Sequence, residues 1–506
     1  MPILGWRVHF TRRNLPVPQE PREVLRGLPP VEVLDRWLDD EDIPDRVPCL
    51  IAPDGRYDLA LNRYFLQADM VDASEHTLAA IAYDLADFLT FLWCHRKPVG
   101  SRTWTDATPE DRAAYKRWRR TDPNGPRVAG STWGRCVATV NQFYKWAVRR
   151  GLVEQNPVVQ RPARSRPGRA RSGQETPAEA PRDGRKAEAG WLPPASYRRW
   201  RDVGVRGYLP TGVRDGSFKG RLASRNATFC DLMVRTGLRL SEQSSLSLFE
   251  VPEVDLGRAY VPTRLPVAIA KGGSGRRIYI AASVLRDVWD YIRFDRAEVV
   301  ERARERGIYD RVADPLVVED PQRASLPPRR SGGRRVAVES LGHRERRRLF
   351  IRGEDGLLEP AALWLTEDGL PVMPGTWKSM FQDANDRCVR HGVALRCHPH
   401  LLRHSFAVVT LEQLQREHIR ELARMSPAQR TSYEQVFGDP QDWVRRRLGH
   451  RSLESTFTYL HTLQELEMET RLALVPDEWE PAGLDSGELE REAADEAYAQ
   501  AGLVVR

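Results

Sequence analysis

One stretch that is poor in large apolar residues, residues 159–190, divides this chain into two parts that must fold separately. Five arginines stand among proline, glycine, serine and alanine in its first half, and mixed charges fill the second half up to Gly190. Such a composition cannot bury a core, so we predict a flexible linker. Its basic half could follow a chain of phosphates, and a solvated tether without contacts fits the composition equally well.

The part before this stretch has the pattern of a small helical domain. Apolar side chains recur at helical spacing along Thr77–Leu92 and along Ser131–Arg150. Between them, Pro109–Arg119 follows Thr108, a good N-cap residue, and begins with proline in its first turn. We therefore predict a helical domain over residues 56–158. The pattern does not indicate a function for this domain, because an ordinary helical bundle whose aromatic residues all lie in the core would show the same pattern.

Composition bounds the partner and the compartment. The 506 residues carry a formal net charge of +8 and a pI near 9.2, which suits a phosphate-rich partner but does not separate DNA from RNA or membrane lipid. The six cysteines include no Cys-x-x-Cys pair, so we expect free thiols in a reducing cytoplasm. We find no apolar run long enough to span a bilayer and no signal-peptide core, and we predict a soluble intracellular protein.

Two consecutive helices are predicted around Arg239. Apolar residues at helical spacing precede Gly237, a residue type that commonly ends a helix, and Leu240–Leu248 can open a second helix. Arg239 would then lie at a helix start, where free N–H groups and the helix dipole favour an anion. Glu242 follows one turn later and can orient a basic partner.

Two further segments combine histidine, arginine and tyrosine. His400 and Arg403 in His-Leu-Leu-Arg share one face of a helix, so a ring nitrogen and a guanidinium can meet on the same anion. His450 ends a Leu-Gly-His, and Tyr459 follows nine positions later. A phenol is a poor nucleophile at neutral pH because its reference pKa is about 10. Histidines and arginines around it would supply proton acceptors and positive charge, which indicates an activated tyrosine directed at a phosphate.

A β-hairpin is predicted between these segments. The stretches Arg258–Val261 and Leu265–Ala270 precede a glycine-rich turn that begins with Lys271, and the alternating stretch Arg276–Ile280 follows it. At the tip of a hairpin, Lys271 could reach into a groove of a partner. A solvated turn lysine is the alternative.

Taken in order, these motifs resemble the tyrosine recombinase (phage integrase) family. Its catalytic domain carries an arginine in Thr-Gly-x-Arg-x-x-Glu, a lysine on a β-hairpin, a His-x-x-Arg, a Leu-Gly-His and a nucleophilic tyrosine. The resemblance covers roughly residues 191–475. It implies a mostly α fold with a small β-sheet (α+β), in which an N-terminal helical core-binding (SAM-like) domain that clamps DNA precedes the catalytic domain.

The resemblance also implies roles for individual residues. The candidate catalytic residues are Arg239, Lys271, His400, Arg403, His450 and Tyr459, with Glu242 in support. The candidate DNA contacts are Arg276, Arg277, His404, Arg161, Arg164 and Arg166. The implied partners are double-stranded DNA with attachment or core sites, further protomers that form a tetramer on synapsed DNA, and accessory proteins, with no membrane; the implied location is the cytoplasm, in association with the nucleoid.

In the mechanism implied by the resemblance, Arg239 and Arg403 hold the non-bridging oxygens of one phosphate while Tyr459 forms a 3′-phosphotyrosyl bond. Lys271 protonates the leaving 5′-oxygen, His400 assists proton transfer and His450 hydrogen-bonds the phosphate. The covalent bond conserves the phosphodiester energy, so we expect no cofactor.

A cluster of thiols and imidazoles raises the question of a metal. Cys388, His391, Cys397, His398 and His400 lie close together in the sequence but fit no standard zinc spacing. We therefore predict no metal site.

Three functions stay open. The first is site-specific integration or excision of a mobile element by recombination. The second is strand relaxation by a monomer that resembles a type IB topoisomerase. The third is DNA binding without cleavage by a protein of the same fold.

Several segments fall outside a compact member of the family. Residues 1–55 form an N-terminal extension of unknown role. An insertion near 300–355 is basic and rich in proline and glycine, and we expect it to be mobile and to add DNA contacts. A second insertion near 411–440 has a helical pattern over Leu411–Gln435. The acidic tail, 476–506, either docks on a neighbouring protomer, as the C-terminal segment of the family often does, or is a solvated helix.

Overall fold

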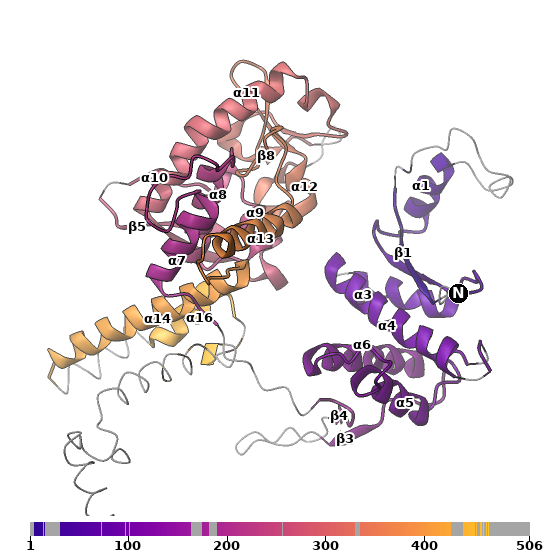
Figure 1. Ribbon diagram of the computed structural model, residues 1–506. Coiled ribbons are helices and arrows are strands. Elements are labelled where there is room, and N and C mark those ends of the chain that lie inside the picture. The colour runs from indigo at the N-terminus through magenta and orange to yellow at the C-terminus, as the bar shows by residue number, and fades with distance from the viewer. Residues whose placement is uncertain are drawn as a thin grey trace, which may run out of the picture. The chain divides into compact units, whose positions relative to one another are not determined.

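The computed structural model describes most of the chain in two compact units, Met1–Lys186 and Ala187–Arg506. Its described residues are 5–13, 15, 31–162, 175–181, 190–426, 439–450, 452, 456, 457, 459, 462 and 464, except for 72, 97, 101, 256 and 329–333. Figure 1 shows the helices and strands of both units.

The first unit is built on three helices that the sequence predicted. Thr108 caps the middle helix, since its hydroxyl accepts from the Asp111 backbone N–H and the Asp111 carboxylate accepts from the Thr108 N–H. The helices bury one aromatic-rich core that includes Phe88, Trp133 and Tyr144. The helices of this unit are α1 (Val31–Asp40), α2 (Leu59–Asn62), α3 (Ala68–Val71), α4 (Glu75–His95), α5 (Pro109–Arg120) and α6 (Gly130–Arg149).

Two strands from the N-terminal extension join this core. β1 (Arg7–Phe10) pairs antiparallel with β2 (Pro48–Ile51). The Trp6 backbone N–H donates to Thr90 Oγ1 of α4 at 2.9 Å. Residues 7–10 and 48–51 are therefore part of the first unit.

Helix α4 corrects one of our expectations. By length and composition alone, it is long and apolar enough to cross a membrane, since an 18-residue window within it has a mean hydropathy of 1.4. Half of this 18-residue window is buried inside the unit. The apolar run exists because α4 is a core helix, with Leu85, Phe88 and Leu92 all buried.

The predicted flexible linker is wrong where the structure describes it. β3 (Gln160–Pro162) pairs antiparallel with β4 (Glu175–Pro177). Beyond β4, Glu179 forms an ion pair with the buried Arg112 at 2.5 Å, and its carbonyl accepts from Trp133 Nε1 at 2.9 Å. Strand pairing and a buried ion pair order this segment without a core of its own. Arg161 lies in β3, while Arg164 and Arg166 lie outside the described residues.

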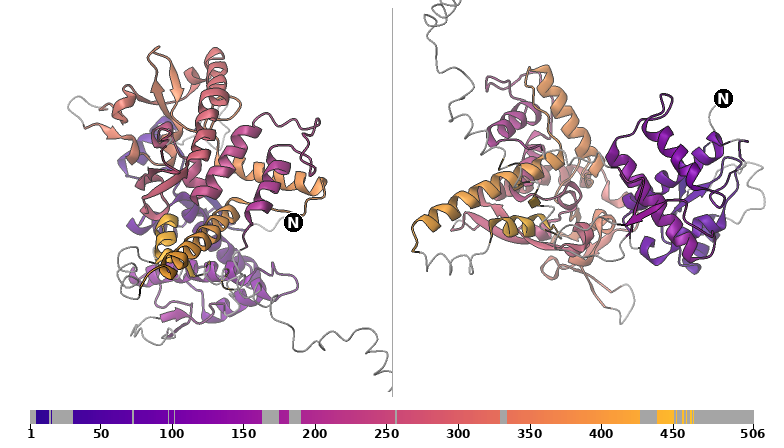
Figure 2. Two further views of the ribbon diagram at one scale, coloured as in Figure 1. Left: turned by 90° about the vertical axis from the view of Figure 1, so that its left-hand side faces the viewer. Right: turned by 90° about the horizontal axis from the view of Figure 1, so that it is seen from below.

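The second unit is mostly helical with small sheets, as predicted. Its core stacks Phe229 on Trp377, with ring centroids 3.6 Å apart, and also buries Trp200 and Trp364. Helix α8 packs against α10 and α14, and α16 lies along α14 (Figure 2). The α-helices among the described residues of this unit are α7 (Pro194–Trp200), α8 (Ala223–Thr236), α9 (Leu240–Ser244), α10 (Ala282–Tyr291), α11 (Ala297–Glu305), α12 (His343–Arg347), α13 (Pro374–Arg390), α14 (Pro399–Ala423) and α16 (Pro440–Leu448).

The predicted hairpin is present with a different tip. β5 (Tyr260–Leu265) pairs antiparallel with β6 (Arg276–Ala281). The predicted strand over Leu265–Ala270 stops at Leu265, because Pro266 has no N–H to donate, and two 3₁₀ turns follow. Lys271 opens the second of these turns.

The basic insertion is folded where it is described, which corrects the expectation of a mobile loop. β10 (Leu349–Arg352) pairs parallel with β7 (Leu316–Val318) and antiparallel with β11 (Leu358–Pro360), and β8 (Ser325–Leu326) pairs with β9 (Val336–Ala337). Short apolar stretches in these strands form a small core of their own. In the second insertion, the predicted helix is confirmed up to Ala423, as the continuation of α14, and residues 427–438 lie outside the described residues.

The insertion depends on one buried arginine. Arg346 donates to Glu250 Oε2 at 2.8 Å and to the carbonyls of Leu341 and Val338, and its side chain is 2% exposed. We expect Arg346→Ala to destabilise this region by about 3–5 kcal/mol, because the Glu250 carboxylate would lose its buried counter-charge. Hydrogen exchange of the β10 amides measures the effect. Arg323→Ala, which removes an exposed pair with Asp320, is the control and should change exchange little; equal protection in both variants would contradict the role of Arg346.

Candidate active site

Gly237 sets the position of Arg239. It ends α8 in the left-handed conformation, with φ of 64°, and a Cβ atom there would lie 2.3 Å from the Phe406 ring of α14. The chain can therefore turn tightly against α14 before α9 begins. Arg239 is the N-cap residue of α9, as predicted from the sequence.

Glu242 accepts hydrogen bonds from three other residues of the site. Its fully buried carboxylate accepts from the Arg239 backbone N–H at 3.0 Å and from Arg239 Nη1 at 2.8 Å. It also accepts from Arg276 Nη2 at 2.7 Å and from the Lys271 backbone N–H at 3.3 Å. Burial alone would raise the pKa of Glu242, but the ion pairs with Arg276 and Arg239 outweigh burial and lower its pKa to about 2.

This lowered pKa predicts a dependence of stability on pH. Because the pKa of Glu242 in the folded state, about 2, lies below its ordinary value of 4.5, the carboxylate stabilises the fold above pH 4.5. That stabilisation, on the order of 3 kcal/mol, is lost as the pH falls from about 5 towards 2. We expect Glu242→Gln to unfold more easily at pH 7, by about 3–5 kcal/mol, and to lose less stability on acidification.

Urea denaturation at several pH values between 7 and 2.5 measures both effects. Glu253→Gln, at an exposed position of the same unit, is the matched control. An unchanged acid slope in Glu242→Gln would contradict the assigned ion pairs.

Arg276 corrects a prediction. We expected it to contact DNA, but it is 9% exposed, and it donates to Glu242 and, through Nε, to the Arg447 carbonyl at 2.6 Å. It thus joins β6 and α9 to the end of α16, where Gly449 and His450 follow. Arg277 is exposed on the same strand, and its role as a DNA contact stays a prediction.

Arg403 is buried behind the site. Its side chain donates to the Gly237 carbonyl and to the Leu448 carbonyl. Arg403 therefore links α14 to the end of α8 and to the end of α16. Burial, and then repulsion by Arg239, lower the pKa of Arg403 to about 9. Two guanidiniums close enough to repel each other form a favourable place for an anion.

Tyr459 lies inside the same cluster. It is 3% exposed, and its hydroxyl is 2.9 Å from His404 Nδ1. The His450 ring lies nearly parallel to the phenol, with centroids 6.1 Å apart, and His450 Nδ1 bonds Thr456 Oγ1 at 3.1 Å. Burial raises the pKa of Tyr459, while Arg403 and Arg239 lower it in part.

The imidazoles around the phenol are neutral at physiological pH. Burial is the main cause that lowers the pKa values of His404 and His450, both to about 4. His400 is exposed, and its ring centroid is 4.7 Å from that of His404. Desolvation and then the charge of Arg403 lower the pKa of His400. Neutral imidazoles beside a phenol can accept its proton.

The structure therefore brings most of the predicted catalytic set together. Glu242 contacts Arg239, and Arg403, His404 and His450 surround Tyr459. The Lys271 backbone N–H donates to Glu242, and the Lys271 side chain is exposed. The structure places His404 against the phenol, and its role as a DNA contact stays a prediction. Its position directly after Arg403, one helical turn from His400, was the available signal.

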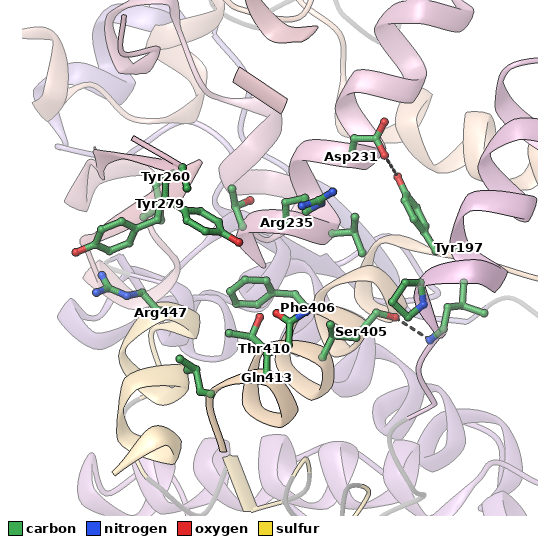
Figure 3. A pocket seen from close by; sticks show the side chains of 18 of the residues that line it. Tyr197, Asp231, Arg235, Tyr260, Tyr279, Ser405, Phe406, Thr410, Gln413 and Arg447 are labelled. Carbon is green, nitrogen blue, oxygen red and sulfur yellow. Dashed lines mark hydrogen bonds between the residues drawn. The ribbon is translucent and has the colours of Figure 1, made fainter. Parts of the chain in front are cut away.

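A separate cavity of about 840 Å³ lies between β5, β6, α7, α8, α14 and α16. Figure 3 shows Phe406, Thr410 and Gln413 along one side, with Tyr279 and Arg447 nearby. Arg239, Arg403, His404 and Tyr459 do not line it. The cavity is therefore distinct from the candidate site. Helix α14 contributes to both, because Ser405 and Phe406 line the cavity and Arg403 and His404 belong to the site.

Comparison with known proteins gives concordant matches. Residues 62–151 match the family model "Phage integrase, N-terminal SAM-like domain". A curated relative, tyrosine recombinase XerC of Roseiflexus castenholzii (strain DSM 13941 / HLO8), is 27% identical over 229 residues. That match covers 45% of this chain and 59% of the relative, so the chain spans less than two thirds of the relative's length.

Solved structures also align with the chain. An integrase of transposon Tn1549, in complex with a circular intermediate DNA, aligns at 13% identity and a TM-score of 0.44, over 81% of this chain and 99% of that chain. The XerH site-specific recombinase, bound to a palindromic difH substrate, aligns at 11% identity and a TM-score of 0.43, over 84% and 87%. A lambda integrase dimer bound to a core site aligns at 12% identity and a TM-score of 0.42, over 84% and 98%.

Proposed function

We propose that this chain, a member of the tyrosine recombinase (phage integrase) family, cleaves and rejoins double-stranded DNA at specific sites through a 3′-phosphotyrosyl intermediate. The observation that carries the proposal is the buried Tyr459 hydroxyl, which lies against a neutral imidazole and close to two guanidiniums. A structural tyrosine has no need of such surroundings, whereas a nucleophile that attacks a phosphate does.

Each residue of the cluster has a part in the proposed reaction. Arg239 and Arg403 bind the non-bridging oxygens and stabilise the pentavalent transition state. Tyr459 attacks phosphorus in line, and the 5′-oxygen leaves with a proton from Lys271. His400 assists proton transfer and His450 hydrogen-bonds the phosphate. Glu242 is a positioning residue, because it fixes Arg239 and the turn that bears Lys271.

The assembly and the setting belong to the same proposal. The domain of residues 56–158 binds the core site, and the unit of residues 191–475 carries the chemistry. Four protomers join two duplexes, and the substrate is the attachment site of a mobile element, with accessory proteins as further partners. The reaction takes place on DNA in the cytoplasm, at the nucleoid, and needs neither metal nor nucleotide because the phosphotyrosyl bond conserves energy.

Covalent capture tests the chemistry without knowledge of the target sequence. The protein is incubated with a pool of nicked duplexes whose core is randomised, in the presence of chelator and without ATP, and adducts are separated on a denaturing gel. We expect an adduct whose sequenced DNA converges on one core. Binding without any adduct would favour the DNA-binding protein that does not cleave.

A second assay separates recombination from strand relaxation. Two differently labelled duplexes that carry the captured core are mixed with the protein. Joined products that combine both labels are expected of a recombinase. Relaxation of supercoiled plasmid without joined products would instead support the monomeric enzyme that resembles a type IB topoisomerase.

A further inference from the structure

We propose that His404 is a catalytic residue, which takes the proton from the Tyr459 hydroxyl as that oxygen attacks phosphorus. The inference rests on the proposed function and assigns a base that the His-x-x-Arg pair alone does not supply. It starts from a contact between a histidine and the reacting atom itself.

The geometry favours His404 over the other two imidazoles. His404 Nδ1 is 2.9 Å from the Tyr459 hydroxyl, within hydrogen-bond reach, and the two ring centroids are 5.4 Å apart. His450 lies nearly parallel to the phenol and uses Nδ1 for Thr456 Oγ1. His400 packs beside His404, and in the part of the chain that the structure describes no hydrogen bond joins it to the phenol.

The charges around His404 keep it ready to accept a proton. The charged and titratable groups that face it are His400, Arg403 and His398, together with the phenol of Tyr459. They and burial keep the imidazole neutral, so Nδ1 has a free lone pair when Nε2 carries the hydrogen. The DNA phosphate would add negative charge beside the ring, which favours the imidazolium as the proton arrives.

The atoms of the step balance. The O–H bond of Tyr459 breaks and its proton passes to Nδ1 of His404, while the phenolic oxygen forms a bond to phosphorus. The bond from phosphorus to the 5′-oxygen breaks, and that oxygen takes a proton from Lys271. In the rejoining step the 5′-hydroxyl attacks phosphorus and returns its proton to the neutral amine of Lys271, while the bond from phosphorus to the phenolic oxygen breaks and His404 gives its proton back to the departing phenol.

The test compares His404→Ala and His404→Gln with wild type in single-turnover adduct formation on the captured duplex. His418→Ala, further along the same helix α14, is the control. We expect both His404 variants to form adduct about 10²- to 10⁴-fold more slowly, with DNA affinity and urea unfolding close to those of the control. Glutamine keeps a polar side chain at this position but cannot take a proton. A slow His404→Gln variant that unfolds as the control does would therefore not owe its defect to misfolding. Added imidazole should restore part of the rate to His404→Ala.

A modified substrate separates the base from the acid. In a 5′-bridging phosphorothiolate, the leaving sulfur needs no proton, so this substrate should restore cleavage to Lys271→Ala but not to His404→Ala. Restoration of both variants, or a wild-type rate in His404→Gln, would overturn the proposal and leave the proposed function intact. A wild-type protein that forms no adduct would overturn both.

Discussion

Arg403→Ala is expected to slow DNA cleavage by about 10²- to 10³-fold, because it removes a preorganised donor from the transition state. It should also destabilise the unit of residues 187–506 by about 2–5 kcal/mol. The Arg403 guanidinium is 2% exposed and satisfies the carbonyls of Gly237 and Leu448, which would be left buried without these donors.

Arg403→Lys separates these two losses. Lysine keeps the positive charge but lacks the planar fork that serves two carbonyls at once. We expect a smaller loss of stability and a cleavage defect close to that of alanine. Urea denaturation gives the first quantity and single-turnover capture, carried out where both variants are folded, gives the second. A lysine variant that cleaves at the wild-type rate would mean that charge alone is needed at this position.

Tyr459→Phe is expected to abolish the covalent adduct while binding to DNA persists. The substitution removes the attacking oxygen and leaves the ring in its buried place, so the unfolding free energy should change only by the lost bond to His404, about 0.5–1.5 kcal/mol. DNA affinity comes mainly from phosphate contacts of basic residues and should stay near that of wild type.

Tyr260→Phe is the control for this variant. Tyr260 is 52% exposed on β5 and lies outside the candidate site. It should capture DNA as wild type does. An adduct that persists in Tyr459→Phe would assign the nucleophile to another residue.

The site could be predicted from the sequence where function depends on local spacing. Gly237 and Arg239 follow from a helix stop and a helix start, and the contact of Glu242 with Arg239 follows from the distance of one helical turn. His400, Arg403 and His404 share a helix for the same reason. Such relations are short in sequence, so they persist whatever packs around them.

The predictions were wrong where contacts between residues far apart in the sequence determine which side chains are buried and which segments are ordered. In the sequence, Arg276 resembles an exposed strand arginine. In the structure it is buried in an ion pair with Glu242, which lies far away in the sequence. The basic insertion was expected to be mobile because its arginines obscured the short strands, and one of those arginines, Arg346, is its buried anchor. The linker was expected to be flexible because its own composition gave no sign of the Arg112 side chain that binds Glu179.

The most direct test of the account is to identify the amino acid that carries the DNA. The adduct formed by wild-type protein is digested with nuclease and protease, and the modified peptide is sequenced by mass spectrometry. The account predicts a nucleotide joined through its 3′-phosphate to Tyr459. A phosphate on any other residue, or a linkage through the 5′-phosphate, would contradict it.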